Sequence, residues 1–286
     1  MLLDRPWPGQ APALQIAAFW AMLAPAPVAL FAVTNASSSD LDSGYRQMYN
    51  LQFEEAHQTF RAWEQSHPDD PLGPTSDAAA YLFAEFDRLG VLQSELFVDD
   101  ERLKKGEKLV SDPETKLAFD SALAKSEQLA NRTLSVSPQD RNALFTEVLN
   151  LGMRGDYLAL IEKRLFISLS YMKNAGILAE RLLAIDPSYY DADLAIGVEN
   201  YILGSSPAPV RWLLRAYGAE TDKNRGIQKL RLTAEKGHYL LPYARLLLGV
   251  VALRDGDRNQ AREILADLAR EFPNNKLYVR ELARLQ

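Results

Sequence analysis

The chain has no cysteine among its 286 residues, and this absence excludes several kinds of chemistry. Without thiols the protein forms no disulfide bond, no thiolate zinc site and no cysteine nucleophile. No N-terminal cysteine is available for lipidation either. The missing cysteines do not by themselves select a cellular compartment.

Catalytic and cofactor-binding motifs are also missing. The three histidines stand far apart, at His57, His67 and His238, and no HExxH pattern or i, i+4 pair predicts a zinc site. Neither a GxxxxGK[ST] loop, a GxGxxG loop nor a GxSxG nucleophile elbow occurs. The carboxylates of residues 99–101 are followed closely by two lysines, which is typical of a solvated turn. We therefore expect no enzyme activity, no cofactor, no metal and no small-molecule substrate.

Charge and composition narrow the class of partner. The net charge of -6 and the pI of about 5.3 argue against nucleic acid, because phosphate binding needs a basic surface. Apolar residues make up 47% of the chain, which is enough for a sizeable core. No strand-like alternation with hairpin turns occurs, so the sequence predicts an all-α fold.

The N-terminus has the features of a secretory signal. Arg5 precedes an apolar run over residues 11–33, and a polar stretch follows. Thr34 and Ala36 occupy the −3 and −1 sites of a signal-peptidase cleavage pattern. The pattern predicts a signal peptide over residues 1–36 and an exported protein, in the periplasm or cell envelope.

An uncleaved anchor is the alternative, because residues 11–33 are long enough to span the inner membrane. Pro25 and Pro27 interrupt that helix, and Asp4 offsets the single basic residue before it. A mistaken start codon is a third interpretation.

A 34-residue frame organises residues 37–286. Positions 7, 8, 15, 16, 20, 24, 27 and 32 of this frame are Leu248, Gly249, Gly256, Asp257, Ala261, Leu265, Leu268 and Pro273. Positions 8, 20, 24, 27 and 32 of an earlier copy are Gly44, Ala56, Phe60, Trp63 and Pro68. The pattern is typical of tetratricopeptide repeats, in which small residues lie where two helices cross.

Two partial frames lie between these copies, at Ala175–Pro187 and Ile196–Gly204, and two insertions interrupt the array. Helices are further predicted over 77–92, from an Asp112 cap and Pro113 to about residue 134, and over 140–151 after a Ser137-Pro138 cap. The prolines at 68, 71 and 74 predict an extended connection, and residues 152–156 predict a turn.

These residues resemble known families. The frames resemble tetratricopeptide repeat proteins, and the stretch from IDPSYY to NNKLY is similar to exported tetratricopeptide proteins of environmental bacteria. More distantly, YNLQFEEAHQTF is similar to the tetratricopeptide-containing inclusion body clearance proteins of the outer mitochondrial membrane. The resemblance covers most of residues 43–286, although Arg245 replaces an aromatic residue and 90–136 fit poorly. It implies a solenoid of helical hairpins and a role in protein–protein contact or assembly.

The resemblance also implies a binding groove. In such arrays the first helix of each repeat lines the concave face, and tyrosine and arginine there supply much of the interface energy. The frames place five such residues on that face: Tyr157, Arg164, Tyr201, Tyr243 and Arg254. The alternative is that their side chains pack against neighbouring repeats. The leading functional hypothesis is a non-catalytic exported scaffold that binds a protein or peptide through the concave face.

A second hypothesis is a membrane-associated structural protein. Within the second insertion, PAPVRWLLRAYG predicts a short amphipathic helix, and residues 211–236 carry seven basic and three acidic residues. The protein would then associate with the membrane through the N-terminal run and the basic insertion 205–236. Within the insertion, Arg211, Trp212 and Arg215 would contact lipid or an anionic partner. Alternatively, this helix packs on the preceding repeat with its arginines in solvent. A third hypothesis, an enzyme site assembled from scattered residues, has no motif in its favour.

Overall fold

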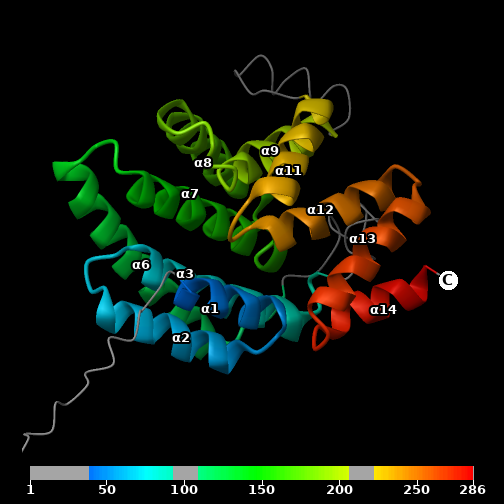
Figure 1. The fold of residues 1–286 in the computed structure, drawn as a ribbon, viewed down its shortest axis with the longest axis horizontal. Helices are drawn as coiled ribbons and strands as arrows, with labels where there is room; N and C mark the ends of the chain where they lie inside the picture. Colours follow the sequence, from blue (N-terminus) through cyan, green and yellow to red (C-terminus); the bar gives the residue numbers. More distant parts are fainter. Residues whose placement is uncertain (1–38, 93–108, 206–221, 286) are drawn as a thin grey trace, which may run out of the picture. The chain divides into compact units, whose positions relative to one another are not determined.

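A computed structural model describes residues 39–92, 109–205 and 222–285, and these residues are all-helical (Figure 1). They contain 11 α-helices, one π-helical turn and no strand. The all-α prediction is confirmed. The chain separates into two compact units, Met1–Asn35 and Ala36–Gln286, of which the first lies outside the described residues.

Each helix packs mainly against its neighbours in the sequence. The helices are α1 (Ser39–Tyr49), α2 (Phe53–Ser66), α3 (Leu72–Leu89), α6 (Pro113–Val136), α7 (Arg141–Asp156), η1 (Tyr157–Ile161), α8 (Leu165–Ile185), α9 (Asp193–Gly204), α11 (Lys223–Lys236), α12 (Leu241–Arg254), α13 (Arg258–Glu271) and α14 (Lys276–Arg284). The pairs with the most extensive packing include α1 with α2, α3 with α6, α7 with α8, and α9 with α11; α12 pairs with α13. In addition, α3 contacts both α1 and α7. The second unit is thus built from successive helical pairs.

Acidic and amide side chains determine where many of these helices begin. The predicted Asp112 cap is confirmed: its carboxylate accepts a hydrogen bond from the Glu114 N–H, with Pro113 as the first helical residue. The predicted Ser137 cap is wrong, because Ser137 ends α6 and Asp140 caps α7. In the same way, the side chain of Asp222 caps α11, that of Asp257 caps α13 and that of Asn275 caps α14.

The prolines before α3 do not form the predicted extended connection. The helix begins at Leu72 rather than at residue 77, so that Pro74 lies in its first turn. Proline is tolerated there because the first N–H groups of a helix have no intrahelical acceptor. The backbone N–H of Thr75 already bonds to the carbonyl of Pro71.

The predicted turn over residues 152–156 is wrong as well. The helix α7 continues through both of its glycines to Asp156 and then into the π-helical turn. Gly155 lies against α8: a Cβ atom added there would be 3.6 Å from the Ser168 carbonyl oxygen. This is an ordinary contact distance, so α7 packs on α8 at Gly155 without requiring glycine there, and the sequence pattern alone did not separate a helical glycine from chain reversal.

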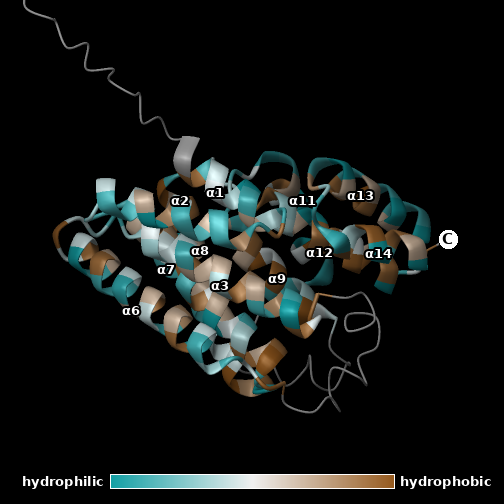
Figure 2. Ribbon diagram, turned by 90° about the horizontal axis from the view of Figure 1, so that it is seen from below, coloured by the Kyte–Doolittle hydropathy of each residue, from teal (hydrophilic) through white to brown (hydrophobic). Residues whose placement is uncertain are grey.

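The pair α1–α2 has the close crossing that the repeat frame predicts for positions 8 and 24. A Cβ atom added to Gly44 would lie 2.3 Å from the Phe60 ring, so only glycine fits the observed packing. Similarly, a Cβ atom added to Gly197 of α9 would lie 3.0 Å from the nearest atoms of Leu230 in α11. Phe60 is fully buried at this crossing. In Figure 2 the helices carry both hydrophilic and hydrophobic residues, as expected when one face packs on a neighbour.

The first helix also contacts the last helices. The ring of Tyr45 stacks on that of Tyr239, with 4.6 Å between centroids, and the Tyr49 hydroxyl donates a 3.0 Å hydrogen bond to the Tyr239 carbonyl. The side-chain amide of Asn275, just before α14, donates a 2.8 Å bond to the Tyr49 carbonyl. Repeats in an open array contact only their neighbours. Here α1 joins the turns that precede α12 and α14.

Candidate functional site

A cavity of about 90 Å³ lies among the first helices of the helical pairs. Residues of α1, α3, α7, α9 and α12 line it, together with Met172 and Ala175 of α8. The wall is mainly apolar and includes Met48, Leu82 and Val148. Three of these helices, α1, α9 and α12, carry positions of the repeat frame, whereas α3 and α7 do not.

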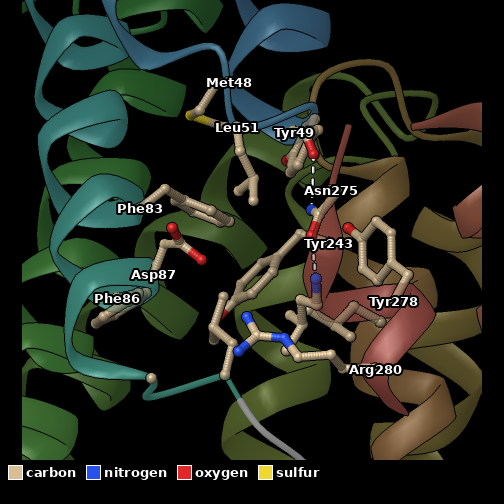
Figure 3. A pocket seen from close by; sticks show the side chains of 14 residues that line it. Met48, Tyr49, Leu51, Phe83, Phe86, Asp87, Tyr243, Asn275, Tyr278 and Arg280 are labelled. Atoms are coloured by element: carbon tan, nitrogen blue, oxygen red, sulfur yellow. Dashed lines mark hydrogen bonds between the residues drawn. The ribbon is translucent and has the colours of Figure 1, made fainter. Parts of the chain in front are cut away.

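A smaller cavity of about 20 Å³ adjoins the first (Figure 3). Four residues line both spaces: Met48, Tyr49, Phe83 and Tyr243. Phe83 and Tyr243 meet edge to face with 5.4 Å between ring centroids. The exposed residues Asp87 and Arg280 point into the smaller cavity from α3 and α14. The smaller cavity thus has charged, exposed residues in its wall.

Three polar groups of the larger cavity have structural partners. The Tyr45 hydroxyl accepts a 3.1 Å hydrogen bond from the Ser76 hydroxyl, and the Tyr49 hydroxyl bonds to a backbone carbonyl. The Asp191 carboxylate accepts bonds of 2.9 to 3.1 Å from three consecutive backbone N–H groups, of residues 238–240. Asp191 thereby fixes the turn that leads into α12.

The carboxylate of Asp156 accepts a weaker hydrogen bond than that of Asp191. This last residue of α7 lines the cavity, and its carboxylate accepts a hydrogen bond of 3.4 Å from the Tyr243 hydroxyl. Burial raises the pKa of Asp156 from 3.8 to about 7, and the Tyr243 bond opposes this rise. Asp156 as a whole is partly exposed and lines the cavity. An occupant of the cavity can therefore reach an acidic group with unused hydrogen-bonding capacity.

The charges of the wall have one sign. Among the described residues that line the larger cavity, Asp156 and Asp191 are acidic and none is basic. In the wall, the Tyr243 hydroxyl bonds to the Asp156 carboxylate, and the described ranges hold no group of three or more His, Asp or Glu residues suited to a metal ion. The arrangement is suited to holding a short apolar chain beside a carboxyl group.

Of the five residues predicted for the groove, all of which are described, Tyr243 lines this cavity. Tyr157 is buried and its ring stacks on Phe119, with 5.5 Å between centroids. Tyr201 is buried against Leu230 and Val251. Both rings pack between helices, which corresponds to the alternative interpretation given above.

The two predicted arginines lie elsewhere. Arg164 precedes α8, is exposed and forms an ion pair of 3.4 Å with Glu162. Arg254 is the last residue of α12 and does not line either cavity. The frame placed one of its inner helices over Tyr157 and Arg164, where the structure has a π-helical turn and the residues before α8. Asp156 was missed because it belonged to a predicted turn.

The basic insertion is only partly described. The three residues predicted to contact lipid or an anion lie outside the described residues: Arg211, Trp212 and Arg215. In α11, acidic partners within the fold pair with three basic side chains, in the pairs Lys223–Asp255, Arg225–Glu180 and Lys229–Asp193. Much of the described basic charge is therefore balanced locally.

His57 of α2 is buried and contacts two residues of α3. Its Nδ1 atom lies 2.5 Å from a carboxylate oxygen of Asp77, and its ring lies 4.0 Å from that of Tyr81. His67 stacks on Trp63, and His238 pairs with Asp42 at 2.7 Å. Each histidine has a local partner of its own.

Within the described ranges no helix is long and apolar enough to cross a membrane, and residues 11–33 lie outside those ranges. No family model, no curated protein and no solved structure matches the chain. The resemblance to tetratricopeptide proteins therefore stays a prediction from the sequence.

Proposed function

We propose that the protein is a non-catalytic binding protein of tetratricopeptide-like architecture, which holds a protein or peptide partner through its inner helices. One observation carries this proposal: these helices surround a mainly apolar cavity of about 90 Å³ that contains a weakly bonded acid. Apolar cavities with a few polar groups are the usual form of binding sites. An exported location, with cleavage near Ala36, belongs to the same proposal and rests on the N-terminal sequence.

The size of the cavity defines how the partner binds. A volume of about 90 Å³ is smaller than the roughly 150 Å³ of an engineered protein cavity that binds benzene. A helix, whose diameter is about 10–12 Å with side chains, is too large to enter. A single extended side chain fits. The interaction thus consists of one inserted anchor residue, with the rest of the partner on the protein surface.

The tetratricopeptide-like architecture has support in the packing. Successive helices form pairs, and Gly44 meets Phe60 as positions 8 and 24 of the frame require. The contacts of α1 with Tyr239 and Asn275 are a departure, because they join the first pair to the last ones. They explain why the interior is a cavity rather than a wide groove.

Gly152 offers a direct test. It lines the cavity, and no atom lies within 4 Å of a Cβ atom added there, so a larger side chain enters the cavity without a clash at Cβ. Wild type, Gly152→Ala and Gly152→Leu are immobilised and exposed to a library of short peptides with one varied position. We expect selective retention by wild type and Gly152→Ala, and loss of it in Gly152→Leu. Equal retention by all three proteins would exclude the cavity as the binding site.

A second candidate function, membrane association, is favoured by one further observation. At the start of α8, three consecutive apolar residues are exposed: Leu165 by 42%, Phe166 by 91% and Ile167 by 41%. Exposed apolar groups of this kind insert into lipid interfaces. Co-sedimentation with vesicles of phosphatidylcholine and phosphatidylglycerol tests this, using the protein from residue 37 onward. Binding that Phe166→Ser abolishes supports the function, and no binding by the wild type contradicts it.

A further inference from the structure

The cavity combines features that select for the charge of its occupant. Its wall carries four aromatic rings, those of Tyr45, Tyr49, Phe83 and Tyr243. Aromatic faces attract cations, most strongly where water is excluded. The acidic groups of the same wall have no basic counterpart among the described lining residues. Both features favour a positive charge inside the cavity.

Asp156 is the acid that an occupant can engage. The other acid of the wall, Asp191, already accepts three backbone hydrogen bonds. Asp156 has the long bond from Tyr243, and its carboxylate can accept several more. An ammonium group has three donors and no acceptor, so it suits a carboxylate with unused lone pairs.

We propose that the cavity binds a protonated alkyl amine, with the apolar chain against the methionine and aromatic side chains and the ammonium group on Asp156. This inference rests on the proposed function, because it names the anchor group that enters the cavity. A lysine side chain of the partner has this chemistry, as does a free short-chain amine. A fatty acid does not, because its carboxylate would lie beside two acids without a basic partner.

Binding of an amine is coupled to the ionisation of Asp156. Burial holds the carboxyl group partly protonated at neutral pH, with a pKa of about 7. A bound ammonium group favours the charged carboxylate and lowers that pKa. In the adjoining smaller cavity, Asp87 and Arg280 have opposite charges, so that region does not repel a cation strongly.

The experiment compares three probes of similar shape and different charge. Binding of n-butylammonium, n-butanol and butyrate to the whole protein is measured by titration calorimetry at pH 7.5. We expect the wild type to bind n-butylammonium at least about tenfold more tightly than butyrate. In Asp156→Asn, which keeps the side-chain shape, this preference disappears while n-butanol still binds. In Gly152→Leu all three probes lose binding.

The outcomes separate this inference from the proposed function. Equal binding of the three probes by the wild type, or an unchanged preference in Asp156→Asn, overturns the amine assignment and leaves the cavity as a binding site. No binding of any probe overturns both proposals.

A second comparison identifies the source of the amine. The probes are acetyl-Gly-Gly-Lys-Gly-Gly-amide and the same peptide with norleucine in place of lysine. Tighter binding of the lysine peptide than of n-butylammonium assigns the site to a protein partner. If n-butylammonium binds and the lysine peptide does not, the amine is a free small molecule, and the anchor-residue form of the proposed function fails.

Discussion

Replacing Asp156 by asparagine should change how the stability of the protein depends on pH. The pKa of this carboxyl group is about 7 in the folded protein, against 3.8 when it is exposed to water. Because the folded-state pKa is raised, the contribution of the group to stability is complete below pH 3.8. It is lost as the pH rises towards 7.

The magnitude follows from linkage. Between these two pKa values the folded protein holds a proton that the unfolded chain has released, so the free energy of unfolding falls by about 1.4 kcal/mol per pH unit. From pH 5 to pH 8 the loss due to Asp156 is therefore roughly 2–3 kcal/mol. Asparagine has nearly the same shape and no charge, so Asp156→Asn should avoid this loss.

Urea unfolding at pH 5 and pH 8 measures the effect. We expect wild type and Asp156→Asn to differ little at pH 5, and the variant to be more stable by roughly 2–3 kcal/mol at pH 8. Burial also raises the pKa values of Glu147 and Glu199 to about 7. These two groups are present in both proteins, and their effect cancels in the difference. A difference between the proteins that is the same at both pH values would refute the burial of Asp156.

Two further predictions concern the packing of the helices. Gly44→Ala places a methyl group against the Phe60 ring and should destabilise the protein by about 1–3 kcal/mol. Gly152→Ala, with open space around its new methyl group, should stabilise α7 by about 0.5–1 kcal/mol. An unchanged stability of Gly44→Ala would contradict the crossing at Gly44. Asn275→Ala removes the cap of α14 and the bond to Tyr49, at a cost of about 2–3 kcal/mol. The neighbouring Asn274→Ala, at an exposed position, should change the midpoint of urea unfolding very little, and equal effects of both variants would exclude a specific role for Asn275.

The sequence was informative where packing depends on neighbours in the chain. The helix crossing at Gly44 and the helix start at Asp112 and Pro113 depend on residues that are close in the sequence, so both were predictable. The contact between Tyr45 and Tyr239 joins residues far apart in the chain, and no periodic pattern encodes it. The repeat frame therefore predicted a groove on the concave face, whereas this contact joins the first helical pair to the turn before α12.

The candidate site was predictable only in part for a related reason. Tyr243 was identified through its frame position and does line the cavity. Tyr157 and Tyr201 satisfy the same rule, yet pack between helices. Which side of a helix faces the interior depends on its rotation against two neighbours, and that rotation is set by tertiary packing.

Methionine methyl groups report on the cavity most directly. Of the five methionines, Met48, Met153 and Met172 line the larger cavity, and the other two lie outside the described residues. In protein labelled with carbon-13 at these methyl groups and titrated with n-butylammonium, the three cavity resonances should shift together and saturate, and Gly152→Leu should abolish the shifts. Three resonances that stay unchanged while the probe binds elsewhere would contradict a ligand-binding cavity between the inner helices.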